Sequence, residues 1–282
     1  RALLNYPSGQ DLNDMLNRLP LAPTISAVVS ERLQPLSSPS RQMLDILAVL
    51  GSKFSPAVAE AVSAYSTEAA VEALEELEKA HFVRPARFGI CDGYEFAHDK
   101  IREVILLSLS FARKRMYHLR IAKAVEAQPG HFQLSDAELA EHFQEGGEYY
   151  LAFKYWLNAA VHALRLSAPR ECGAAYRHAA QLLEHLTGVI TEDELRGLLS
   201  SWISLEYDLN DLNVLEQVSQ QAQDLGAALN SSLLQGVGLS GKAMYHYSIS
   251  QHKQALALIE QAIQQTASAH SRVEDARNSV RR

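Results

Sequence analysis

The sequence predicts a mainly α-helical protein in two parts, a compact domain that holds a small β-hairpin and, after it, an array of repeated helices. Three observations predict this fold class. Hydroxyl side chains that suit helix starts recur ahead of apolar residues spaced three and four apart. Two short stretches, at residues 82–84 and 94–96, read as strands, and in the second Tyr94 and Phe96 alternate with Glu95 and Ala97. Beyond residue 135 all periodic stretches have helical spacing.

Composition limits the classes of protein that the chain can belong to. Its 282 residues suit about two domains, and 47% hydrophobic residues are enough to build buried cores. A formal charge of -7 argues against an overall field that attracts nucleic acid or an anionic membrane. The chain holds no run of about 18 apolar residues and no export signal, so we expect no membrane contact.

The two cysteines, Cys91 and Cys172, lie far apart in the sequence and show no metal-ligand spacing. We therefore expect free thiols and a cytoplasmic location, where the compartment is reducing. The chain does not begin with methionine, and we interpret it as a piece of a longer protein.

The first 22 residues read as the end of a helical lid or linker, since a short apolar pattern from Leu12 to Leu19 stops at Pro20. A domain over residues 23–128 follows and opens with a helix at Pro23. Two further helix starts are indicated by Ser38-Pro39 and Ser55-Pro56, where a capping hydroxyl stands before a proline at the first helical position.

A fourth helix, capped at Ser66-Thr67, carries mostly acidic residues on its outer face. They are Glu68, Glu72, Glu75, Glu76 and Glu78, with Lys79 as the only base. A DNA phosphate backbone repels such a face, so we reject DNA recognition by this helix and expect no nucleic-acid partner. Two short strands then meet across Gly89 and Asp92-Gly93, and this order of helices and hairpin predicts a winged-helix domain.

The second strand runs directly into a helix at His98-Asp99. Tyr94 and Phe96 alternate with polar or small neighbours, and from Ile101 onward the apolar spacing is helical. We expect Asp99 to cap that helix, and His98 to be held at a corner where it can meet a group outside the domain.

This corner, Phe96-x-His98-Asp99-x-Ile101-Arg102-Glu103, resembles the Met-His-Asp segment in the winged-helix domain of STAND signalling ATPases, with Ala97 in place of the methionine. The likeness extends over about residues 15–128, including Leu19-Pro20 and Ala48-Val49-Leu50-Gly51-x-x-Phe54. It implies that His98 and Asp99 sense ADP bound to an ATPase core that is not part of this chain. It also implies ATP or ADP and Mg²⁺ as cofactors of the full-length protein and none for this piece.

Residues 111–125 predict a basic helix in an acidic chain. Its basic residues are Arg113, Lys114, Arg115, Arg120 and Lys123, with no acid among them. They form either a solvated face or a docking face. As a docking face they would meet the acidic fourth helix, the protein's own upstream ATPase domain or, least favoured, nucleic acid.

From Ser135 onward the chain reads as a helical array over residues 129–282. Ser135–Glu138 and Thr191–Glu194 are capping boxes. A frame of small, large and alanine residues recurs at Ala152-Trp156-Ala159, Cys172-Tyr176-Ala179 and Ala255-Ile259-Ala262, with a degenerate copy at Leu215-Ser219-Ala222. This frame resembles the tetratricopeptide repeat, although the intervals are less regular than a fixed period, and an unrelated helical array stays open. Stacked helix pairs of this kind bind protein partners or effectors.

The sequence indicates no catalytic residue and no metal site. The segment Gly236-Val237-Gly238-Leu239-Ser240-Gly241-Lys242-Ala243 has the glycines and lysine of a phosphate loop, but Ala243 replaces the hydroxyl that binds Mg²⁺. We interpret it as a repeat helix rich in small residues. His178 and His185 suit a solvated or packed pair better than metal ligands.

These observations predict a regulatory and partner-binding piece of a STAND-type signalling ATPase, with no enzymatic activity of its own. An alternative of another class is a stand-alone tetratricopeptide-type adaptor in which the winged helix is only a scaffold. A DNA-binding transcriptional regulator is less favoured because the fourth helix is acidic.

Overall fold

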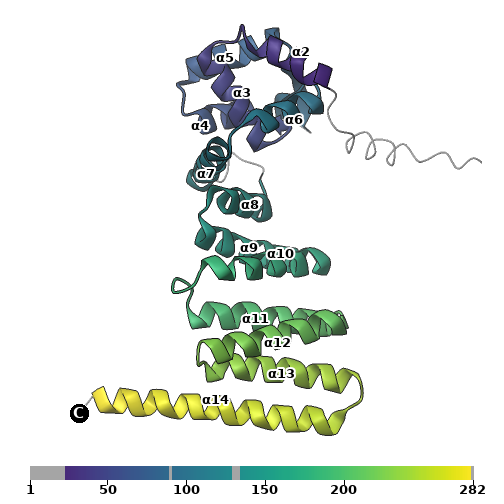
Figure 1. Cartoon of the computed structure of the whole chain (residues 1–282), viewed down its shortest axis with the longest axis vertical. Helices are drawn as coiled ribbons and strands as arrows, with labels where there is room; N and C mark the ends of the chain where they lie inside the picture. Colours follow the sequence, from purple (N-terminus) through teal and green to yellow (C-terminus); the bar gives the residue numbers. More distant parts are fainter. Residues whose placement is uncertain (1–22, 89–90, 129–133, 281–282) are drawn as a thin grey trace, which may run out of the picture. The chain divides into compact units, whose positions relative to one another are not determined.

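The computed structural model describes residues 23–88, 91–128 and 134–280 of the chain. They divide into two compact units, with the border between Gln133 and Leu134. Helices make up most of both units, and the strands of the described residues form one small antiparallel sheet in the first unit (Figure 1). The predicted fold class is confirmed. The pattern expected at residues 12–19 lies outside the described residues.

The first unit has the order of elements of a winged helix. Its elements are α2 (Pro23–Leu33), α3 (Ser38–Leu50), β1 (Lys53–Phe54), α4 (Pro56–Ser63), α5 (Thr67–Lys79), β2 (Val83–Phe88), β3 (Cys91–Phe96), α6 (Asp99–Ser108) and α7 (Phe111–Ala127). The strands lie in the order β1-β3-β2. Strand β1, in which Phe54 pairs with Tyr94, was not predicted, because two residues are too few to show an alternating pattern.

Serine side chains cap the starts of α3, α4 and α5. Ser55 accepts from the backbone N–H of Val58 at 3.2 Å, and Ser66 accepts from that of Ala69 at 3.3 Å. The predicted cap Ser38 is wrong by one residue. Ser37 holds the cap position, because Pro39 lies second in the helix and Ser38 is already helical.

The hairpin is longer than the sequence indicated. Strands β2 and β3 pair from Val83 with Phe96 to Phe88 with Cys91. Asp92-Gly93 was expected in the turn but lies inside β3, because Asp92 pairs with Arg87 and their side chains form an ion pair at 2.9 Å. Gly89, the other residue expected between the strands, lies outside the described residues.

Helix α3 lies at the centre of the first unit, since Met43, Leu44, Ile46 and Leu47 are fully buried. Phe82, at the start of the hairpin, is also fully buried, and the guanidinium of Arg32 lies 4.9 Å from the centre of its ring. The apolar faces of the surrounding helices thus cover one core.

The second unit is a stack of antiparallel helices (Figure 1). Its elements are α8 (Asp136–Gly146), α9 (Tyr149–Arg165), α10 (Pro169–Gln181), the 3₁₀ turn η1 (Leu182–His185), α11 (Glu192–Asp208), α12 (Leu212–Ala228), α13 (Ser232–Ser248) and α14 (His252–Val280). From α11 on, the helices begin at residues 192, 212, 232 and 252, so the repeating unit is a single helix of 17 residues and a turn of three. The capping boxes predicted at Ser135 and Thr191 are both confirmed.

The turns between these helices share one backbone geometry. Asn210, Asn230 and Ser250 all have φ between 53° and 63°, in the left-handed region. In the first of these turns the N–H of Asn210 donates to Tyr207 O and that of Asp211 to Glu206 O, which is a Schellman motif. The same pair of bonds recurs at the next two turns. Backbone geometry therefore sets the regular spacing of the array.

The glycine and lysine segment at 236–243 is part of α13 and forms no phosphate loop, which confirms its interpretation as a repeat helix. Its glycines allow α12 and α13 to approach closely. A Cβ atom on Gly238 would lie 2.6 Å from Ser219 O, and one on Gly241 would collide with the Ser219 hydroxyl. Close packing between helices explains these small residues without any ligand.

Candidate functional site

The corner between β3 and α6 is fixed on one side and open on the other. Phe96 is buried, and its N–H donates to Ser52 O at 3.1 Å, while the N–H of Ala97 donates to Phe82 O at 2.9 Å. Ile101, in the first turn of α6, is buried as well. His98, between these anchors, is exposed. Its backbone carbonyl accepts from the N–H of Ile101 at 3.0 Å, and its imidazole makes no hydrogen bond within the part of the chain described.

Asp99 does not cap α6, so that prediction is wrong. The cap position belongs to His98, whose backbone is extended and whose side chain makes no capping bond. Asp99 is instead the first helical residue, because the chain already turns helical there, and its carboxylate can act only through the helix dipole and nearby charges. The His98 side chain does not cap α6, and the N–H of Ile101 bonds back to His98 O at 3.0 Å. The N–H groups of Asp99 and Lys100 are then the ones that an anion beside His98 could meet.

Arg102 holds α6 against α3. Its Nε donates to Ala48 O, in the last turn of α3, at 2.8 Å. Burial lowers the pKa of Arg102, whereas the negative charge of Asp99 raises it. Asp99 therefore supports a positive charge that anchors the corner. Both members of the predicted pair, His98 and Asp99, are exposed.

Three arginines serve helix ends in this unit in the same way. Arg32 donates to Ala80 O at 2.6 Å and to His81 O at 2.9 Å, just past the end of α5. Arg120, from α7, donates to Ser63 O at the end of α4. Arg102, from α6, bonds the last turn of α3 in the same way. A guanidinium thus satisfies carbonyls at the negative ends of three helices.

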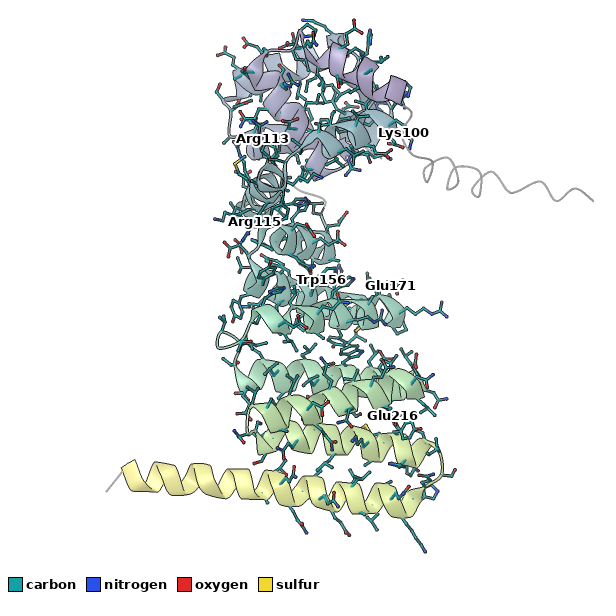
Figure 2. The ribbon with its side chains drawn as sticks, viewed as in Figure 1. Lys100, Arg113, Arg115, Trp156, Glu171 and Glu216 are labelled. Carbon is teal, nitrogen blue, oxygen red and sulfur yellow. The ribbon has the colours of Figure 1, made fainter. Side chains whose placement is uncertain are left out.

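The structure separates the five basic residues predicted as a docking face on α7. Arg120 bonds inside the unit, and Arg113 lies 3.8 Å from the carboxylate of Asp45. Burial raises the pKa of Asp45, and of the charges that lower it Arg113 has the largest effect. Lys114 is half-buried, whereas Arg115 and Lys123 are exposed. Arg113 and Arg115 both extend from α7 in Figure 2.

Exposed apolar residues accompany the basic ones on α7. Phe111, at the start of the helix, is 78% exposed, and Met116 is 50% exposed. Five positions apart, Phe111 and Met116 lie on different sides of the helix, so they are two separate exposed apolar positions on α7. The use of α7 as a docking face stays a prediction.

The acidic helix α5 is partly structural. Glu76 accepts from the backbone N–H of Ser37 at 2.7 Å and from the hydroxyls of Ser37 and Ser40 at 2.6 Å each. The Ser37 hydroxyl is the largest cause that lowers the pKa of Glu76. Glu76 therefore ties α5 to the start of α3, while Glu68 and Glu72 remain exposed.

A buried carboxylate lies between α10 and α11 in the second unit. Glu206 is 4% exposed, and its Oε1 accepts from Trp202 Nε1 at 2.8 Å. Burial raises the pKa of Glu206, while the bond from Trp202 and the charge of Arg177 lower it. Gly173 leaves room for this carboxylate, since an added Cβ would lie 3.2 Å from Oε1. No pattern in the sequence indicates this buried carboxylate, because glutamates on helices are usually exposed.

The two histidines weighed as metal ligands stack on aromatic rings of α9. His178 lies on Trp156 with ring centres 4.4 Å apart, and His185 lies on Tyr149 at 4.2 Å. Both histidines are therefore packed against aromatic rings, as the sequence indicated. The residues that the structure describes hold no group of three potential metal ligands. Nor does any helix among them have the length and apolar character needed to cross a bilayer.

No protein-family model matches the chain, and no curated protein matches it. Among solved structures, the chain is similar to a signal transduction ATPase with numerous domains (STAND) from Pyrococcus horikoshii, a protein with a tetratricopeptide repeat sensor. The sequences are 13% identical over 88% of this chain and 41% of that one, and the TM-score is 0.30. The chain thus spans less than half of that protein. A TM-score of this size carries no argument about fold or function, so the proposals below depend on this chain's own residues.

Proposed function

We propose that this chain is the regulatory and partner-binding part of a STAND-type signal-transduction ATPase. The observation that carries the proposal is the corner at His98. The imidazole is exposed at the uncapped start of α6, while Phe96, Ile101 and Arg102 hold the backbone around it. Fixed N–H groups and an imidazole directed outward suit the oxygens of a phosphate group.

In this proposal the phosphate belongs to ADP bound in an ATPase core upstream. The core would supply the nucleotide site and Mg²⁺, and the winged-helix unit would donate a hydrogen bond from His98 in the resting, closed state. A bond that exists in only one of two states shifts their equilibrium by its own free energy. His98 would therefore favour the closed state, and Asp99 would act through Arg102.

The helical array would receive the signal. Stacked helices with a regular turn present a continuous surface, and the helices after α11 have such turns. A protein effector bound there would favour the open state if it bound the open arrangement more tightly. The alternative, a stand-alone adaptor, uses the same surface but gives His98 no role.

Nucleotide binding separates these two functions. We expect calorimetry of this chain with ATP and Mg²⁺ to show no micromolar binding, because its only glycine and lysine segment is helical. Labelled ADP should leave the intact protein more slowly than it leaves a version that lacks residues 23–128. Equal release rates would contradict the sensor function and favour the adaptor. Micromolar ATP binding that Lys242→Ala abolishes would contradict our account of α13.

The array has its own test. Baits of the whole chain and of a chain that ends at residue 133 should differ in the partners that they capture, with the effector present only on the whole chain. If both recover the same proteins, the effector does not bind the array.

A further inference from the structure

Helix α9 carries apolar side chains on two sides. Its buried side, which includes Trp156 and Ala160, packs within the second unit. A second stripe consists of Leu157, which is half-buried, Val161, which is 45% exposed, and Leu164, which is 47% exposed. Spacings of four and three residues place these three side chains on one side of the helix. A helix that is apolar all round is usually covered on both sides, so the stripe is a candidate contact surface.

The stripe lies on a helix with described neighbours before and after it in the sequence. These neighbours, α8 and α10, both pack on α9 and leave Val161 and Leu164 exposed. At 1.5 Å per residue, the stripe from Leu157 to Leu164 is about 10 Å long, which is two turns. Two turns suit an amphipathic helix that makes contact through side chains at i, i+4 and i+7.

Two basic side chains lie along one flank of the stripe. Lys154 precedes Leu157 by three residues, and Arg165 follows Val161 by four, so both lie on the same side of α9 as the stripe. Both are exposed, and α9 holds no Asp or Glu. In a chain with a formal charge of -7, this side of α9 is a local surface that is both apolar and basic.

The two basic side chains differ in what surrounds them. The Lys154 ammonium lies 5.8 Å from the centre of the Tyr150 ring, and Tyr150 donates to Glu194 at 2.8 Å. An acid of the array thus lies close to Lys154. The Arg165 side chain forms no ion pair and no hydrogen bond within the part of the chain described. Its charge is therefore open to an anionic group of a partner.

The charges decide which kind of partner fits the stripe. A second copy of α9 would bring its own basic flank against this one, and like charges across a contact are unfavourable. The overall charge of the chain repels an anionic bilayer, and two turns are short for a helix that lies in a membrane surface. A helix with an apolar stripe and acidic flanks matches both the apolar and the basic side chains of α9.

We propose that the stripe of α9 is a docking surface for an acidic amphipathic helix of a partner protein. Apolar side chains of the partner cover Val161 and Leu164, and its carboxylates lie beside Lys154 and Arg165 at the two ends of the stripe. The proposal rests on the proposed function in one respect, since this partner is then the class of effector that the array receives. The contact is small, so we expect a dissociation constant on the order of 100 micromolar.

Fluorescence anisotropy of a labelled peptide, with the whole chain and no nucleotide, tests the surface. The probe is a helical peptide of about 20 residues, with leucines at i, i+4 and i+7 and glutamates on both flanks. Its control has lysines in place of the glutamates. The wild-type chain should bind the glutamate peptide at least about tenfold more tightly than the lysine peptide. A chain without this preference would overturn the proposal.

Variants of the stripe locate the binding. Val161→Asp and Leu164→Asp should each weaken binding of the glutamate peptide at least about tenfold, since each places a carboxylate in an apolar contact. Leu256→Asp is the matched control, because Leu256 is an exposed apolar residue on α14 of the same unit. It should leave binding unchanged. Equal losses from Leu164→Asp and Leu256→Asp, in variants with unchanged melting temperatures, would show that the peptide does not bind α9 and overturn the proposal.

Arg165→Glu tests the charge on the flank. It should weaken binding of the glutamate peptide at least about threefold and strengthen that of the lysine peptide. If neither affinity changes, the basic flank does not select the partner and the proposal is wrong.

A lipid surface and the sensor function are tested separately. The wild-type chain should not sediment with vesicles of phosphatidylcholine and phosphatidylserine. Sedimentation that Leu164→Asp abolishes would assign the stripe to a bilayer and contradict the helical partner. None of these measurements involves nucleotide, so a failure here leaves the ADP-release test unaffected. Equal ADP release in that test would in turn leave peptide binding by α9 unaffected.

Discussion

The contacts inside the first unit differ in kind from those inside the second. In the first, polar side chains reach across long stretches of sequence, as when Arg102 donates to Ala48 O and Glu76 binds Ser37. In the second, backbone turns and small residues let the helices approach, as at Gly238 against Ser219. Polar bonds between distant residues also occur in the second unit, as from Tyr150 to Glu194 at 2.8 Å. The difference is therefore the close packing of glycine against a neighbouring helix, as at Gly238, which the array adds to such bonds.

The largest expected effect breaks the packing of the array. Gly238→Ala places a Cβ 2.6 Å from Ser219 O, and relieving that collision requires α12 and α13 to separate. We expect a loss of about 2–3 kcal/mol in the free energy of unfolding, measured by urea denaturation. Gly197→Ala is the matched control, because a Cβ on this helical glycine meets nothing within 4 Å. It should be neutral or stabilise by up to about 1 kcal/mol. Equal effects of the two changes would contradict close packing at Gly238.

The next effect breaks a directed bond in the first unit. Arg102→Met keeps much of the side-chain bulk but leaves Ala48 O without its donor. Because Arg102 is half-buried, we expect a loss of about 1–2 kcal/mol, seen as a lower denaturation midpoint. Arg84→Met, which removes an ion pair at the surface with Glu95, should cost less than about 1 kcal/mol. If both variants lose the same stability, the arginines at helix ends contribute no more than surface pairs.

A pH-dependent effect sharpens the comparison, because Glu206 is a polar exception within the packed array. Burial raises the pKa of Glu206, so its folded form holds a proton more tightly than its unfolded form. The stability that this proton contributes is fully present below the pKa of Glu206 in the unfolded chain. It is lost as the pH rises through the higher pKa of Glu206 in the folded chain. Glu206→Gln, which keeps an acceptor for Trp202, removes this dependence. Relative to wild type it should gain stability as the pH rises from 4 to 8. A difference that stays constant with pH would show that Glu206 is not affected by burial.

The smallest effect concerns the start of α6. Since Asp99 is the first helical residue and makes no capping bond, Asp99→Ala should cost less than about 0.5 kcal/mol through the helix dipole. Ser66→Ala, which removes an observed cap on α5, should cost about 1 kcal/mol. In thermal unfolding, Ser66→Ala should lower the melting temperature more than Asp99→Ala does. The reverse order would restore Asp99 as a cap.

Much of the fold was visible in the sequence, because caps and apolar spacing are local signals. The capping boxes at Ser135 and Thr191 and the helical nature of 236–243 were all predicted. Strand β1 was missed because it exists only through its pairing with β3. The 20-residue spacing of the last helices was also missed, since turns at Asn210 and Ser250 lack the glycine that usually indicates a left-handed residue.

The candidate site was predictable only in part. His98 could be found because it follows a strand and precedes a helix, but the same pattern favoured Asp99 as a cap that the backbone does not form. On α7 the sequence indicated a basic helix, but not that Arg113 lies 3.8 Å from Asp45 and that Arg120 donates to Ser63 O. Residues far apart in sequence supply those partners, and no local pattern encodes them.

His98→Ala in the intact protein tests the central claim most directly. A hydrogen bond to a charged phosphate contributes about 1.5–3 kcal/mol, so ADP affinity should fall by one to two powers of ten and basal output should rise without an effector. The melting temperature of this chain should not change, because the exposed imidazole makes no hydrogen bond within its described part. His162→Ala, at an exposed histidine on α9, should alter none of these quantities. Unchanged ADP affinity and output together with a clearly lower melting temperature would contradict the sensor and make His98 a packing residue.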